Sequence, residues 1–216
     1  TSGFSISQYT GTGSAATIGH GLGAVPKMVL VKRTNTTGNW TMYHHSIGAT
    51  KYIYLNSTST EATASSIWND TAPTSSVFSV GTDGEVNGSG STYVAYCFAE
   101  KTGFSKFGLY EGNGNTDGTF IYTGFKPAFV VLKGKGNSSN WGIHDGARDV
   151  DNPIQKGLLA NTSAVEDTHD FMDMLSNGFK LRSSSTNRNG SGQGYIYWAF
   201  AKAPIVGSNN VPCTAR

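Results

Sequence analysis

Charged residues are scarce in this sequence. Asp, Glu, Lys and Arg make up 14% of its 216 residues and leave a formal net charge of +2, whereas soluble domains carry about 25% charged residues. No stretch concentrates Lys and Arg as a nucleic-acid contact requires, because such contacts release counterions through clustered positive charge. No apolar run approaches the roughly 20 residues of a membrane span. The sequence therefore predicts a protein that binds no nucleic acid and inserts into no membrane.

Cysteine is almost absent, with only Cys97 and Cys213. A disulfide framework normally shows more cysteines at regular spacing, so we interpret Cys97, which lies in an apolar run, as a small core residue. The short motifs of common enzymes and cofactor sites, GxSxG, GxxxxGK[ST], HExxH and CxxC, are missing as well. We therefore expect no catalysis and no bound cofactor, apart from the calcium hypothesis given below.

One stretch of the sequence occurs twice. Residues 87–100 read NGSGSTYVAYCFAE and residues 189–202 read NGSGQGYIYWAFAK. Each is a glycine-rich turn followed by eight residues that are apolar or small on both sides of the pleat, which predicts a strand covered on both faces. Proline-led β-branched runs at 23–32 and 124–133 recur at a similar offset. A period of about 100 residues is too long for a solenoid repeat and indicates one β unit used twice.

Many short strands with glycine turns predict an all-β fold. We expect two tandem, related β-sandwich-like units, residues 1–102 and 103–205, followed by an exposed tail, residues 206–216. One larger sandwich, to which each repeat contributes a sheet, is the alternative. Residues 161–166 could form a short helix that starts at a Ser or Thr cap. Because the chain begins at Thr1 rather than Met, an upstream segment in a longer protein is compatible with it.

Aromatic residues without a counterpart in the other half are the candidates for a binding surface, since the fold needs them less. The candidate ligand-binding residues are the unmatched Tyr52, Tyr54 and Trp68, with Tyr43 and His45 as their neighbours. Exposed aromatic planes stack on sugar rings, and they also suit protein contacts. A tyrosine pair packed against a neighbouring subunit is therefore the alternative to a glycan site.

Acidic residues raise two further hypotheses. Asp145, Asp149 and Asp151 are candidate ligands of a structural Ca²⁺, which binds six to eight oxygen atoms. The segment lacks the spacing and the glycine of a helix-loop-helix calcium site, so a solvated loop with an ion pair to Arg148 is the favoured interpretation. Glycosidases need two carboxylates about 5 to 9.5 Å apart, and the 14 acidic residues are scattered. A polysaccharide depolymerase is therefore an alternative without named residues.

Several strings together carry a resemblance to a known family. They are GHGLG (19–23), YVAYCFAE (93–100), YTGFKPAFV (122–130), SNGFKLR (176–182) and NNVPCTAR (209–216). With these strings the chain resembles, from end to end, a tandem β domain found in virion proteins of marine tailed phages. In such proteins the domain often lies C-terminal, sometimes beside a lectin-like sandwich. The resemblance implies a tail, fibre or surface-decoration module, and it brings no catalytic or binding residues with it.

The expected function is a non-enzymatic virion structural module that adheres to a host surface glycan. The expected partners are other virion proteins, further copies of the chain in a homo-oligomer, and that glycan. The expected location is the virion, assembled in the host cytoplasm. Two alternatives stay open: a capsid or tail decoration protein without a host ligand, and the depolymerase.

Overall fold

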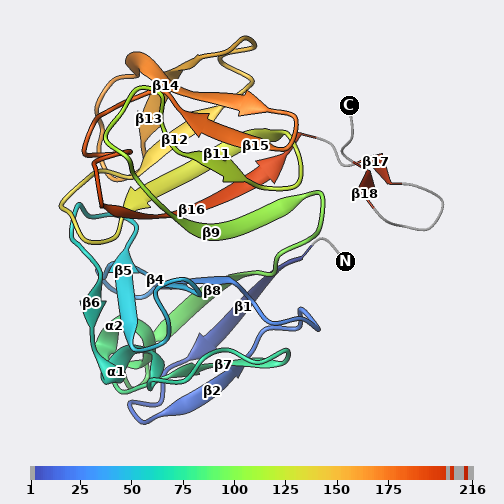
Figure 1. Ribbon diagram of the computed structural model, residues 1–216. Helices are drawn as coiled ribbons and strands as arrows, with labels where there is room; N and C mark the ends of the chain where they lie inside the picture. Colours follow the sequence, from blue (N-terminus) through green and yellow to red (C-terminus); the bar gives the residue numbers. More distant parts are fainter. Residues whose placement is uncertain (1–2, 203–204, 207–211, 214–216) are drawn as a thin grey trace. The chain divides into compact units, whose positions relative to one another are not determined.

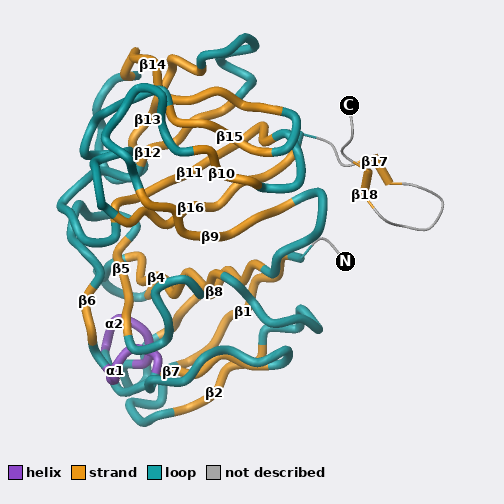
Figure 2. Tube along the Cα trace, viewed as in Figure 1, coloured by secondary structure: helices purple, strands orange, loops and turns teal. Residues whose placement is uncertain are grey.

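The computed structural model describes residues 3–202, 205–206 and 212–213 (Figure 1). This part of the chain is all-β, as expected, and its two helices, α1 (Ser65–Trp68) and α2 (Gly84–Asn87), have four residues each (Figure 2). None of its helices is long and apolar enough to cross a membrane. The chain divides into two compact units, which we call unit 1 (Thr1–Glu100) and unit 2 (Lys101–Arg216).

Unit 1 contains two antiparallel sheets. The larger sheet has six strands in the order β1-β8-β3-β4-β5-β6, and the smaller sheet pairs β2 with β7. Polar and glycine-containing turns separate short runs of β-branched and aromatic residues, which is why the strands are short. The strands are β1 (Phe4–Thr10), β2 (Ala16–Gly19), β3 (Met28–Arg33), β4 (Trp40–His44), β5 (Lys51–Tyr54), β6 (Ala62–Thr63), β7 (Val77–Val80) and β8 (Thr92–Phe98).

The core of unit 1 lies between these two sheets. Val29, Val31 and Ala95 contribute from the larger sheet, while Phe78 and Val80 contribute from β7, and all five are buried in one cluster. Each Å² of apolar surface removed from water stabilises the fold by about 25 cal/mol. Burial on both sides therefore holds the sheets face to face in a sandwich-like arrangement.

Strand β8 is one of the two repeated strands. Its small residues Ala95 and Cys97 line the core beside Tyr93, while Val94 and Tyr96 lie on the opposite face. Cys97 is fully buried and carries a free thiol, which confirms its interpretation as a small core residue. Burial raises the pKa of this thiol to about 12.

Unit 2 contains an antiparallel sheet of eight strands in the order β10-β15-β14-β13-β12-β11-β16-β9, besides a two-stranded pair near the end of the chain. The strands are β9 (Ser105–Glu111), β10 (Phe120–Tyr122), β11 (Pro127–Gly134), β12 (Gly142–Asp145), β13 (Ile154–Leu159), β14 (Asp167–Leu175), β15 (Gly178–Leu181) and β16 (Gly194–Ala201). The sheet curls so that its two ends share one core. The ring of Phe179 on β15 lies 6.3 Å from that of Tyr110 on β9 and 5.4 Å from that of Tyr197 on β16. The result is a sandwich that is nearly closed into a barrel.

Strands in matching positions of the two units pair in the same order. The order is β1-β8-β3-β4-β5 in unit 1 and β9-β16-β11-β12-β13 in unit 2. Individual contacts match too, because Tyr9 donates a hydrogen bond to the carbonyl of Val86 and Tyr110 donates one to the carbonyl of Arg188, each at 2.6 Å. Unit 2 differs in β14, which joins β13 to β15 in one sheet. That both units descend from one repeated unit stays a prediction.

The helix considered for residues 161–166 is absent, so this prediction is wrong. The side chain of Asn161 instead accepts a hydrogen bond from the Trp141 N–H at 2.9 Å and donates one to Asn140 Oδ1 at 2.8 Å. These bonds hold the segment as a non-helical connection after β13. Of the predicted tail, residues 206–216, the structure describes only Val206, which belongs to β17 (Ile205–Val206), and β18 (Pro212–Cys213), which pairs with β17. The rest of the tail lies outside the described residues.

Candidate functional site

Two of the predicted ligand-binding aromatics are buried in the core of unit 1. Tyr43 on β4 is 5% exposed, and Trp68 at the end of α1 is 2% exposed. Their rings meet edge to face, with centroids 6.2 Å apart. The apolar area of Trp68 packs α1 onto the larger sheet, which is why this aromatic residue is needed by the fold. The prediction that Tyr43 and Trp68 belong to a surface site is therefore wrong.

The other three predicted residues are half-buried. Tyr52 and Tyr54 on β5 contact each other edge to face at 5.1 Å, and Tyr52 also packs against the core. Burial, together with a hydrogen bond to Tyr52, raises the pKa of Tyr54. His45 follows β4, and its Nε2 lies 3.3 Å from the hydroxyl of Ser46. A ligand-binding role for Tyr52, Tyr54 and His45 stays a prediction.

The three predicted calcium ligands do not form a common set. Asp145 accepts a hydrogen bond from the backbone N–H of Arg148 and pairs with the guanidinium Nη2 of that residue at 2.6 Å, which confirms the favoured ion pair. Asp149 accepts a hydrogen bond from the backbone N–H of Gln155 at 2.8 Å, and Asp151 is exposed. Within the described residues, no group of three or more His, Cys, Asp or Glu side chains is placed to hold a metal ion.

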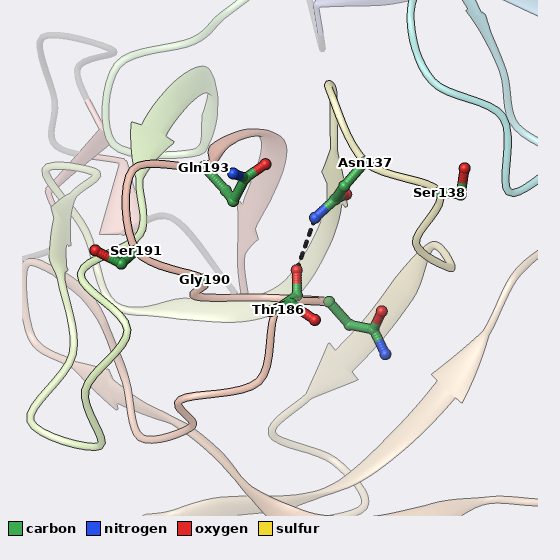
Figure 3. A pocket seen from close by; sticks show the side chains of 7 residues that line it. Asn137, Ser138, Thr186, Gly190, Ser191 and Gln193 are labelled. Atoms are coloured by element: carbon green, nitrogen blue, oxygen red, sulfur yellow. Dashed lines mark hydrogen bonds between the residues drawn. The ribbon is translucent and has the colours of Figure 1, made fainter.

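A polar pocket of about 340 Å³ lies in unit 2 between two loops (Figure 3). One loop follows β11 and the other precedes β16. The lining residues are Asn137, Ser138, Thr186, Asn187, Gly190, Ser191 and Gln193, all of them uncharged. Asn137 joins the two loops, because its Nδ2 donates a hydrogen bond to the backbone carbonyl of Thr186 at 2.8 Å, drawn as a dashed line in Figure 3. We call this cavity the unit 2 pocket.

The loop before β16 is held in place by the buried side chain of Asn189. Its Oδ1 accepts a hydrogen bond from the backbone N–H of Asn113 at 3.0 Å. Its Nδ2 donates to the carbonyls of Asn115 at 2.8 Å and Ser183 at 2.9 Å. These bonds form within the protein, so a ligand does not have to order the loop, and that part of the entropic cost of binding is avoided.

The lining of the unit 2 pocket offers free hydrogen-bonding groups. In the described part of the chain, the side chains of Ser138, Asn187, Ser191 and Gln193 make no hydrogen bond, and Asn137 Oδ1 is buried without a partner. A hydroxyl both donates and accepts, and a carboxamide offers both functions as well. The chemistry of the pocket therefore suits a ligand rich in hydroxyl groups.

Unit 1 has a second polar hollow of about 390 Å³, lined by Gln8, Tyr9, Thr10, Thr34, Thr92 and Tyr93. Several of its polar groups are already engaged within the protein. The hydroxyls of Thr34 and Thr92 lie 2.7 Å apart, and the hydroxyl of Tyr9 donates to the Val86 carbonyl. This hollow is therefore poorer in free donors and acceptors than the unit 2 pocket.

Sequence reasoning missed the unit 2 pocket. Residues 135–139 and 186–193 are rich in Asn, Ser and Gly, and this composition was interpreted as ordinary turn chemistry. The same composition also describes a surface able to bind hydroxyl groups, and it was the available signal. Only the structure shows that the two segments, far apart in sequence, face each other across one cavity.

Comparison with known proteins gives a family and no characterised relative. A family model described as a domain of unknown function, DUF7483, matches residues 1–204. No curated protein and no solved structure matches the chain.

Proposed function

The chain belongs to the DUF7483 family, whose function is unknown, and from the chemistry of its own surface we propose that it is a non-enzymatic carbohydrate-binding module. The observation that carries the proposal is the unit 2 pocket, in which every lining residue is neutral and several carry free hydroxyl or amide groups. Sugars present hydroxyl groups that donate and accept. A neutral, preformed polar pocket on a rigid β-sheet is therefore well matched to them.

The setting that we propose is the surface of a phage virion, on a tail, a fibre or a decorated capsid. This part rests on the resemblance of the sequence to virion proteins of marine tailed phages. Adhesion to a host glycan would then come from several copies of the chain acting together, because one polar pocket binds a sugar weakly. Multivalent display raises avidity by roughly 10² to 10⁴ fold without any new contact.

A purely structural role is the second candidate, and one surface feature favours it. Strand β10 is at the edge of the unit 2 sheet and exposes Phe120 (43%) and Tyr122 (65%). An open strand edge with exposed aromatic side chains suits pairing with another protein chain. In this role the protein would assemble with other virion proteins or with its own copies and would bind no host molecule.

Binding of the full chain to a panel of polysaccharides tests the proposal, with the protein displayed on beads to provide multivalency. We expect binding to at least one glycan, and we expect the double variant Ser138→Ala, Gln193→Ala to weaken it at least about tenfold, because two hydrogen-bonding groups are lost. Gln8→Ala in the unit 1 hollow is the matched control and should bind as the unchanged protein does. Absence of binding to every glycan would favour the structural role.

The same panel separates the binding module from a depolymerase. We expect no release of reducing ends during prolonged incubation with any polysaccharide that binds. Reproducible release that a single Asp→Asn or Glu→Gln substitution abolishes would show the two-carboxylate chemistry of a glycosidase. That result would replace the proposal by the enzyme alternative.

A further inference from the structure

A buried lysine lies beneath the unit 2 pocket. Lys133 is 0% exposed, and its Nζ donates to the carbonyl of Gly134 at 2.7 Å, to the carbonyl of Asn137 at 3.1 Å and to the hydroxyl of Ser139 at 3.4 Å. All three acceptors are neutral, and no carboxylate of the described residues pairs with this ammonium group. Burying a charge without a counter-charge is costly. The ammonium also stabilises the loop that carries Asn137 and Ser138 on the pocket wall.

A second buried cation follows the pocket residue Asn187. Arg188 is 6% exposed, its guanidinium lies 4.2 Å from the ring centre of Phe171, and its Nε donates to His144 Nε2 at 3.3 Å. A guanidinium stays protonated in proteins, and in the described part of the chain it has no carboxylate within ion-pair distance. This guanidinium packs on Phe171 and His144, and the charge of Asp167 acts on it from nearby. Lys133, which bonds the carbonyl of the pocket residue Asn137, is therefore the interior charge next to a pocket that no acidic residue lines.

Unit 1 has an internal carboxylate at the corresponding hairpin, on Glu85. Lys32 of unit 1 donates to the carbonyl of Gly38 at 2.8 Å, in the hairpin that corresponds to the loop after β11. In that hairpin Glu85 accepts from the backbone N–H of Asn39 at 2.6 Å and from Asn39 Nδ2 at 3.1 Å. A bidentate, charge-assisted pair of this kind is among the stronger hydrogen-bonded contacts in proteins.

Matching contacts identify the positions of unit 2 that correspond to this pair. Tyr93 bonds the Gly84 carbonyl as Tyr195 bonds the Thr186 carbonyl, each at 2.6 Å, so Glu85 corresponds to Asn187. The side chains of Asn56 and Asn161 donate to Asn39 and Asn140 at 3.0 and 2.8 Å, so Asn39 corresponds to Asn140. Unit 2 thus keeps the donor residue and has a neutral amide in place of the carboxylate.

The two donors of Asn140 meet no acceptor in the described part of the chain, neither its backbone N–H nor its Nδ2. Asn140 lies in the same loop as Ser138, and Asn187 lines the pocket opposite. We infer that the unit 2 pocket selects sugars that carry a carboxylate, whose oxygens accept from both donors of Asn140 in the way that the Glu85 carboxylate accepts from Asn39. This inference rests on the proposed function and names the class of sugar.

Electrostatics and hydrogen bonding favour the same ligand. A ligand carboxylate would supply a negative charge close to Lys133, which has no carboxylate partner of its own among the described residues. It would also pair the free donors of Asn140. A neutral sugar could bond the hydroxyls and amides of the pocket and would leave Lys133 without a counter-charge.

Titration with trigalacturonate and with its fully methyl-esterified form tests the inference, because the two ligands share the same sugar chain and the ester lacks the carboxylate charge. We follow the backbone amide of Asn140 by NMR, which suits weak binding, in the full chain at constant ionic strength. We expect the acid to shift the Asn140 amide and to bind at least about tenfold more tightly than the ester, a difference of about 1.4 kcal/mol. Sodium acetate at the same carboxylate concentration is expected to leave this amide unchanged, since it lacks the sugar contacts.

Substitution of Asn187 provides the matched pair of variants. Asn187→Glu restores the internal carboxylate of unit 1 and is expected to abolish the preference for the acid, while the neutral Asn187→Gln retains it. Asn187→Glu should melt at the same temperature as Asn187→Gln or higher, which excludes misfolding as the cause.

Three results would overturn the inference: equal binding of acid and ester, an unmoved Asn140 amide, or equal preference in both variants. In the first case the carbohydrate-binding module survives with a neutral ligand. If no sugar of any kind binds, the proposed function fails and this inference fails with it.

Discussion

The rings of Tyr110 and Tyr195 lie parallel across the β9–β16 pair, with centroids 5.1 Å apart and an interplanar angle of 14°. Both hydroxyl groups reach the loop of the unit 2 pocket, where Tyr110 donates to the carbonyl of Arg188 and Tyr195 to the carbonyl of Thr186, each at 2.6 Å. Tyr9 and Tyr93 stack in the same way in unit 1, at 5.1 Å and 15°. The stacked pair of unit 2 therefore connects the core directly to the binding loop.

Tyr195→Phe is expected to weaken both stability and binding. The Tyr195 hydroxyl accepts from the Gly190 N–H at 2.8 Å and donates to the Thr186 carbonyl. The substitution leaves the Gly190 N–H without this partner, while the Thr186 carbonyl keeps its bond from Asn137, and it should cost about 1 to 3 kcal/mol of unfolding free energy. Tyr93→Phe removes the same two kinds of bond in unit 1 and is the matched control. Urea denaturation should show similar losses for both, and glycan binding should fall only for Tyr195→Phe. Equal glycan binding by the two variants would show that the loop held by Tyr195 is not part of the glycan-binding site.

The all-β class could be predicted from the sequence because strands follow from short-range residue patterns. The repeated runs 93–100 and 195–202 combine β-branched and aromatic residues with glycine turns, and they form β8 and β16. The same patterns predicted that Cys97 is buried, because both faces of a strand that is covered on both sides are removed from solvent.

The placement of individual aromatics could not be predicted in the same way. The sequence makes Trp68 look less needed by the fold, because the matching position of unit 2 falls near His169. In the structure Trp68 pairs with Tyr43 as Phe171 pairs with His144 at 4.6 Å. Trp68 belongs to α1 and Phe171 to β14, and these two rings are 103 residues apart, whereas Tyr43 and His144 are 101 apart. Such a shift is a tertiary property, and no short-range pattern reports it.

The unit 2 pocket was beyond prediction for a related reason. Its two loops are far apart in sequence, and each has an ordinary turn composition. The informative difference, Asn187 in place of Glu85, becomes visible only once hydrogen bonds show that these two positions correspond.

Acid should destabilise the protein through His144. Burial, with the nearby charge of Arg188, lowers the pKa of His144 to about 3 from its ordinary value of 6.5. Between these two values the unfolded chain binds a proton that the folded chain does not, so the free energy of unfolding falls as the pH falls from 6.5 toward 3. The full effect is of the order of 4 kcal/mol.

Comparison of variants isolates this contribution. His144→Gln keeps an acceptor for Arg188 and should show a shallower loss of stability on acidification, measured by thermal unfolding from pH 7 to pH 4. His169→Gln removes a surface histidine whose side chain is 70% exposed and should retain the slope of the unchanged protein. A slope unaffected by His144→Gln would assign acid sensitivity to other groups.

Alkaline conditions should act in the opposite sense through Lys133. Burial lowers the pKa of its ammonium group to about 8 from the ordinary value of 10.5. Between pH 8 and pH 10.5 the unfolded state binds more protons, so this residue makes the free energy of unfolding rise with pH, by roughly 1 to 3 kcal/mol. Cys97 opposes it above pH 9, because the pKa of that thiol is raised from 9.0 to about 12.

The difference between Lys133→Met and the unchanged protein removes the Cys97 contribution, which is common to both. We expect the advantage of the unchanged protein over Lys133→Met to grow between pH 7.5 and pH 9.5 in urea denaturation. Lys126→Met, at an exposed position just before β11, is the control and should show no such trend. A constant difference for Lys133→Met across this range would mean that Lys133 ionises as it does in water.

Glu85→Gln in unit 1 should reproduce the donor arrangement that unit 2 has. The substitution removes the charge from the bidentate contact with Asn39 and places amide hydrogens against its donors, so unit 1 should lose about 1 to 3 kcal/mol of unfolding free energy. Glu111→Gln, at an exposed position on β9, is the matched control and should stay within about 0.5 kcal/mol of the unchanged protein. If the donors of Asn39 then bind an external carboxylate, trigalacturonate should shift the Asn39 amide in Glu85→Gln and leave it unchanged in the parent. The contrary outcome is a Glu85→Gln variant that is as stable as the parent and whose Asn39 amide does not shift with trigalacturonate. That result would show that the Glu85 carboxylate does not occupy the place that a ligand carboxylate takes in unit 2.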